Sequence, residues 1–197
     1  MTDDQTTAAP RTATLPTAGS RTADSRTADS RTADSRTTTL RTADERATLA
    51  SFLDHQRDTL AMKCAGLTAA QLRTRVLEPS GLSLLGLVRH LAEVERSWFR
   101  NILDGEGRHG FWKHPDGTFA EFDVETADPE EAFAVWRREC DHARELVAAA
   151  PSLDVLGHHG EEVFSLRWIL THMIEEYARH NGHADLLREH LDGTTGE

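Results

Sequence analysis

One stretch near the C-terminus, residues 166–188, constrains the fold of this chain most strongly. Its sequence, LRWILTHMIEEYARHNGHADLLR, is typical of a single amphipathic helix. At about 100° per residue, its apolar side chains fall on one arc of roughly 100°. These residues are Leu166, Ile169, Leu170, Met173, Tyr177, Ala184 and Leu187. A helix with so wide an apolar stripe has to bury it against other elements.

A carboxylate and an imidazole, Glu176 and His180, fall on the same arc. Burying such groups is costly unless something pairs with them. Because they stand four residues apart on a helix, they can point at one shared partner. We favour a metal ion as that partner. The alternative is a hydrogen-bonded Glu–His pair that only fixes the register of an ordinary core.

Three further helices are predicted before this one. The first runs from Asp44 to about residue 65, the second from Ser83 to about residue 103, and the third from Asp128 to Pro151. A capping box at Thr68 predicts a short extra turn. Residues 104–127 are rich in glycine and predict a long loop with a short strand near Phe119–Val124, and residues 157–160 predict a turn.

Four long helices with one long connection predict an all-α fold. We expect an up-down-down-up four-helix bundle with the long loop between helices 2 and 3. This domain should span residues 44–197. Residues 1–43 carry an SRTAD repeat with almost no large apolar side chain, so they are predicted to form a disordered tail.

Metal sites in bundles are built from side chains that project inward from facing helices. Glu176 and His180 supply two ligands, and His90 on the second helix is the best third candidate by position. Two histidines and one carboxylate suit Zn²⁺ first, although nickel, iron and manganese remain alternatives. His172 and His183 lie at the polar edge of the same face and are rivals, either as supporting groups or as substitute ligands.

Composition excludes several classes of function. The 197-residue chain has a formal net charge of −11 and no basic stripe, which argues against a nucleic-acid partner. No apolar run reaches membrane-spanning length and the N-terminus lacks a signal-peptide apolar region, so we expect a cytoplasmic protein. The two cysteines, Cys64 and Cys140, show no metal-binding spacing and are predicted to be reduced core thiols.

Two segments, GLSLLGLVRHLAEVERSWFR and LRWILTHMIEEYARHNGHADLLRE, resemble the hallmark helices of the DinB superfamily. They resemble most closely its actinobacterial mini-circle protein branch, and the likeness spans about residues 44–197. The resemblance implies a four-helix bundle with a divalent metal, often zinc or nickel. It implies His90 and His180 as ligands. Glu176 stands where most members have histidine, as in the mycothiol-dependent maleylpyruvate isomerase branch.

The same resemblance implies a metal-dependent S-transferase or isomerase that activates a small thiol of the mycothiol type as a thiolate. The electrophile is expected at the mouth of the bundle near the long loop, with His172 or His183 shuttling a proton. Two alternatives are metal-assisted hydrolysis and a non-catalytic metal- or ligand-binding stress protein. Exposed apolar helix edges are compatible with a homodimer.

Overall fold

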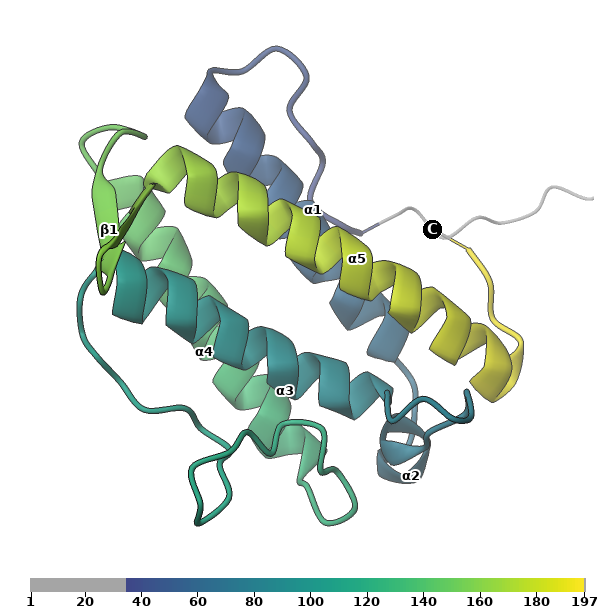
Figure 1. The fold of residues 1–197 in the computed structure, drawn as a ribbon. Coiled ribbons are helices and arrows are strands. Elements are labelled where there is room, and N and C mark those ends of the chain that lie inside the picture. The colour runs from purple at the N-terminus through teal and green to yellow at the C-terminus, as the bar shows by residue number, and fades with distance from the viewer. Residues whose placement is uncertain (1–34, 197) are drawn as a thin grey trace, which may run out of the picture. The chain divides into compact units, whose positions relative to one another are not determined.

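The computed structural model describes residues 35–196, and this part of the chain is mostly helical with one small hairpin (Figure 1). The long helices are α1 (Glu45–Cys64), α3 (Leu84–Glu95), α4 (Pro129–Ala149) and α5 (Leu166–Asp192). Helix α3 continues directly into a π-helical segment, η1 (Arg96–Leu103). The shorter elements are α2 (Ala69–Arg73) and the strands β1 (Leu156–His159) and β2 (Glu162–Ser165).

Local sequence signals set the helix boundaries. Before each predicted helix, one side-chain oxygen accepts a backbone N–H from the first turn, which satisfies a donor that has no partner inside the helix. The residues that do so are Asp44, Thr68, Ser83, Asp128 and Ser165. Helix α5 ends at Gly193, whose φ of 76° is a left-handed conformation that glycine adopts without strain. The predicted helix starts are therefore confirmed.

The helices pack as two neighbouring pairs, α1 with α5 and α3 with α4, and α3 also contacts α5. Helices α3 and α4 run in the same direction, so the connection between them has to return along their length (Figure 1). The strand predicted at Phe119–Val124 is wrong, because the described loop contains only an isolated bridge between Lys113 and Phe119. Those two residues flank one turn at residues 115–117, and the pairing does not extend far enough to form a strand.

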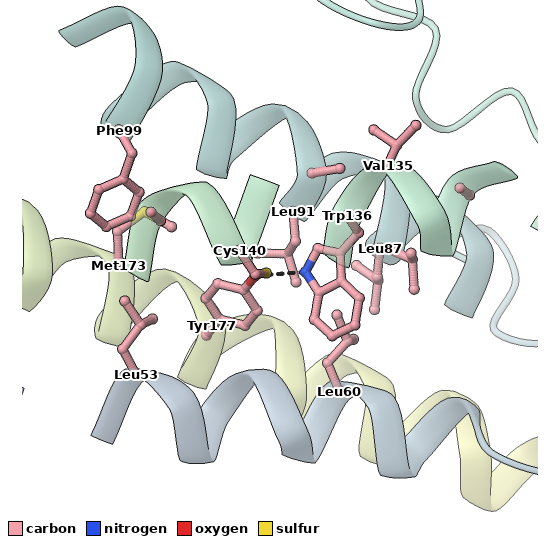
Figure 2. Packing of buried hydrophobic residues seen from close by; sticks show 14 of the residues in the cluster. Leu53, Leu60, Leu87, Leu91, Phe99, Val135, Trp136, Cys140, Met173 and Tyr177 are labelled. Carbon is pink, nitrogen blue, oxygen red and sulfur yellow. Dashed lines mark hydrogen bonds between the residues drawn. The ribbon is translucent and has the colours of Figure 1, made fainter. Parts of the chain in front are cut away.

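The core contains the apolar stripe that the sequence of α5 predicts. All seven residues of that stripe are fully buried, and Met173 and Tyr177 pack with residues of α1, α3 and α4 (Figure 2). The two cysteines are free and buried, as predicted. Burial raises the pKa of the Cys64 thiol to about 12, so it stays protonated.

A charged network lies inside this core, and the sequence patterns did not predict it. Arg57 of α1 donates from Nε and Nη2 to the two carboxylate oxygens of Glu95, at 2.8 and 2.7 Å. Tyr177 donates to Glu95 at 2.8 Å, and Trp136 donates to the Tyr177 hydroxyl at 2.7 Å (Figure 2). Arg57 is only 3% exposed and Glu95 is fully buried, so each charge depends on the other.

Residues 35–43 differ from the prediction that the tail extends to residue 43. The Thr37 amide and hydroxyl both donate to Asp58 of α1, and the Leu40 amide donates to Ser51. His55 contacts the Thr37 carbonyl at 2.9 Å. This segment therefore belongs with the helical unit, because polar side chains on α1 satisfy its backbone. Residues 1–34, which carry the repeat, lie outside the described residues.

The prediction of a turn at residues 157–160 is largely wrong, because residues 157–159 belong to strand β1 and pair with β2, and of this range only Gly160 lies in the hairpin turn. The hairpin packs against the end of η1. A Cβ atom on Gly157 would lie 2.6 Å from the Ile102 carbonyl oxygen, a contact that backbone atoms cannot relieve by rotation. We expect Gly157→Ala to destabilise the protein by about 1–3 kcal/mol in urea denaturation, because the hairpin or η1 has to shift.

Gly81→Ala provides the control for this substitution. No heavy atom lies within 4 Å of the position of its added Cβ, so stability should change by less than about 0.5 kcal/mol. Equal stability of the two variants would show that the hairpin does not pack as described.

Candidate metal centre

Three predicted ligands from two helices meet at one point. His90 projects from the middle of α3, and Glu176 and His180 project from successive turns of α5. The Nε2 atoms of His90 and His180 lie 3.2 and 3.3 Å from the same oxygen, Oε1 of Glu176. One donor atom from each residue lies within 4.8 Å of the other two. The predicted helix spacing therefore brings these three side chains together.

The protonation states of this cluster suit metal binding. Burial by itself raises the pKa of Glu176, but the hydrogen bond with His90 and the charge of His180 outweigh it, so the pKa lies below its usual value. Burial and the neighbouring His90 lower the pKa of His180. At neutral pH the carboxylate is therefore ionised and the His180 imidazole is neutral, which are the forms that bind a metal.

The donor set fits a transition metal by its chemistry and spacing. Zinc–nitrogen and zinc–oxygen distances of about 2.0–2.2 Å place pairs of ligand atoms roughly 3–4 Å apart. The contacts of 3.2 and 3.3 Å in the cluster fall in that range. All three residues are partly buried, so one side of the site stays open to a small molecule.

His183 lies beside this cluster but not within it. Its Nδ1 atom lies 3.3 Å from Nδ1 of His180, on the nitrogen that faces away from Glu176. The geometry therefore makes His183 a neighbour of a candidate ligand. The catalytic role predicted for it stays a prediction.

His172 lies in an aromatic cluster about one helical turn before Glu176. Its ring stacks on Trp168 with centroids 5.0 Å apart and contacts the edge of Trp98 at 4.6 Å. Its Nδ1 atom is 3.8 Å from Glu175. None of these contacts joins His172 to the three candidate ligands, so it is placed by its aromatic neighbours.

A cavity of about 370 Å³ opens beside His90. Helix α3 and η1 form one wall, and the long loop forms the other. Its lining combines basic, aromatic and polar side chains with two acids, including Trp98, Asn101, Lys113, Phe119 and Glu121. The cavity is large enough for part of a small organic substrate, and His90 is the candidate metal ligand that lines it.

The long loop supplies residues that the sequence analysis missed. Glu121 is buried, and its Oε1 atom lies 3.6 Å from Nδ1 of His90. Phe122 stacks on the His90 ring with centroids 5.3 Å apart. These residues are in an irregular segment, where no helical period indicates which side chains point inward. Nothing in the sequence of the loop distinguishes Glu121 and Phe122 from its exposed acidic and aromatic residues.

A second group of metal-binding residue types, Asp104, Glu106 and His142, lies at the end of η1 and on α4. It is less suited to a metal, because Glu106 already accepts hydrogen bonds from Arg100 at 2.8 Å and Arg108 at 2.6 Å. Two guanidinium groups neutralise the carboxylate that a cation would need. We therefore assign this group to the surface ion pairs.

The fold and site together define a helical protein with a two-histidine, one-carboxylate cluster between facing helices. Residues 48–193 match the model of the family described as Mycothiol-S-transferase, and the chain belongs to this family. The family is DinB-like, so the predicted superfamily is confirmed. The likeness to the mini-circle branch stays a prediction. No curated protein matches the chain. No helix among residues 35–196 is long and apolar enough to cross a membrane.

Proposed function

We propose that the chain is a metal-dependent S-transferase that joins a low-molecular-weight thiol of the mycothiol type to a small electrophile. Family membership supports the thiol and the reaction class. The observation that carries the metal dependence is the convergence of two imidazole nitrogens and one carboxylate oxygen at His90, Glu176 and His180. Zn²⁺ is the first candidate metal, and nickel, iron and manganese are alternatives with the same ligand types.

A divalent metal at this position would lower the pKa of a neighbouring thiol and so favour the nucleophilic thiolate. The residues of the chain do the rest. The cavity beside His90 takes the reactants, with Trp98 and Phe119 contacting apolar parts. Glu176 is held between two imidazoles, so we assign it to holding the metal rather than to moving protons.

We propose different roles for the two remaining histidines. His183 can accept a hydrogen bond from the Nδ1–H of His180, which would leave the unprotonated Nε2 of His180 to bind the metal. His172 is a candidate proton carrier, because it contacts Trp98 in the cavity wall. We also propose that the helix directions correspond to the predicted up-down-down-up four-helix bundle. The homodimer stays a prediction.

The proposed function is tested by a thiol-dependence assay. The purified chain is loaded with Zn²⁺ and given a bimane electrophile, with and without a low-molecular-weight thiol, at pH 7. A thiol whose pKa falls from about 8.5 to about 7 contains roughly fifteenfold more thiolate at this pH. We expect S-conjugate formation to exceed the enzyme-free rate by about tenfold or more, and to stop when a chelator removes the metal.

Two outcomes would contradict the proposal. Consumption of the electrophile at the same rate without thiol would indicate a metal-bound water as nucleophile and favour the hydrolase alternative. Stoichiometric metal without turnover, across a panel of thiols and electrophiles, would favour the non-catalytic binding protein.

A further inference from the structure

The environment of His90 contains two buried polar atoms that lack hydrogen-bond partners. Nδ1 of His90 and Oε2 of Glu121 are both inaccessible to solvent and unpaired within the described residues. The Oε1 atom of the same Glu121 lies 3.6 Å from that Nδ1, which is longer than a hydrogen bond. Buried polar atoms without partners are rare in proteins, so an adjacent pair of them calls for a physical reason.

The tautomer of His90 provides that reason. A neutral imidazole carries its proton on only one nitrogen. In a ligand that binds through Nε2, the proton has to be on Nδ1, and it then needs an acceptor. Glu121 is the carboxylate on that side of the ring, opposite the side on which Nε2 meets Glu176.

The loop holds Glu121 at this place by its contacts with α3. Phe122, the next residue, stacks on the His90 ring. Arg89, the residue before His90, donates to the Asp123 carbonyl oxygen at 2.5 Å. The two residues that follow Glu121 are therefore fixed to the same helical turn that carries His90, and they hold the Glu121 carboxylate beside the His90 ring.

From this geometry we infer that Glu121 is a positioning residue for the metal centre: its carboxylate accepts the Nδ1–H of His90 and so presents Nε2 to the metal. This inference rests on the proposed metal site and deepens it. A carboxylate behind a ligating histidine fixes the ring orientation and raises the basicity of the ligand. The contact between Glu121 and His90 also makes the long loop, residues 104–127, part of the proposed metal centre.

The test compares the Zn²⁺ dissociation constants of full-length variants, measured by competition with a chromophoric chelator. We expect Glu121→Ala to weaken Zn²⁺ binding by about 10- to 100-fold. Glu121→Gln keeps an acceptor oxygen without the charge and should weaken binding less. Glu125→Ala is the matched control, because Glu125 is an exposed acid of the same loop that pairs with Arg75; its dissociation constant should equal that of the unaltered chain.

A second measurement separates positioning from a general structural role. In the Zn²⁺-loaded chain, ¹H–¹⁵N NMR should show the His90 proton on Nδ1, and this signal should shift in Glu121→Gln while the Co²⁺ absorption spectrum keeps its ligand-field pattern. If Glu121→Ala does not fold, Glu121→Gln decides the question.

Three results would overturn the inference. The first is a Zn²⁺ dissociation constant within twofold of the unaltered chain in both Glu121 variants. The second is a Co²⁺ spectrum showing a lost ligand, which would make Glu121 a ligand itself. The third is an unaltered chain that binds no Zn²⁺, which would also overturn the proposed function. The first two leave the metal site in place.

Discussion

Replacing His180 with alanine is expected to reduce bound Zn²⁺ from about one ion per chain to near zero, because only two of the three ligands remain. Thiol transfer should fall to the rate without enzyme. The protein should still fold, since the apolar stripe of α5 that packs in the core is untouched. Elemental analysis of the purified variant, together with its circular dichroism spectrum, checks both expectations.

His190→Ala is the matched control for this substitution. His190 lies on the same helix, but it is exposed and its Nδ1 contacts the Leu186 carbonyl oxygen. Its removal should leave metal content and activity unchanged. His90→Ala should behave like His180→Ala, because the two imidazoles share one carboxylate oxygen. Normal metal content in His180→Ala and His90→Ala would contradict the assignment of the site.

Replacing Glu95 with alanine is expected to cost about 3–5 kcal/mol of stability, measured by urea denaturation. The reason is the charge that remains. Arg57 is 3% exposed and would lose both of its hydrogen bonds to Glu95. Tyr177 would lose its acceptor as well. Arg57 would keep only its Nη1 hydrogen bond to the partly exposed Asp54, at 2.9 Å. A buried guanidinium with so little compensation is more costly than the lost pair itself.

The control substitution and a paired variant test this reasoning. Glu145→Ala removes an exposed acid from α4 and should change stability by less than about 0.5 kcal/mol. Replacing Arg57 with Met and Glu95 with Leu together should recover most of the loss, because no unpaired charge remains. A cost below about 1 kcal/mol for Glu95→Ala alone would show that water reaches Arg57.

The parts of the structure that were predicted correctly depend on local signals. Helical periodicity identified the buried face of α5 and placed Glu176 and His180 on it, and capping residues such as Ser83 and Asp128 marked the helix starts. His90 followed from its position on the apolar edge of α3 and from family resemblance. These signals depend on neighbours within a few residues of one another, so a single sequence contains them.

The parts that were missed depend on contacts between distant segments. Arg57 and Glu95 are 38 residues apart, and neither position on its helix indicates that the two charges pair inside the core. Glu121 belongs to a loop without a regular period. The segment before α1 was assigned to the tail because its composition is polar. Asp58 and Ser51 satisfy its backbone, and composition alone does not reveal such contacts.

The shared direction of α3 and α4 has a consequence for selectivity. Two parallel neighbours cannot be joined by a tight turn, so the chain has to cross the whole height of the pair between them (Figure 1). That crossing brings Lys113 and Phe119 over the opening beside His90. The connecting loop therefore lines the cavity with these two residues, and residues 113–119 are exposed and can be exchanged without changing the packing of the core. We therefore expect a swap of residues 113–119 to change which electrophile the proposed site accepts without altering the candidate metal ligands.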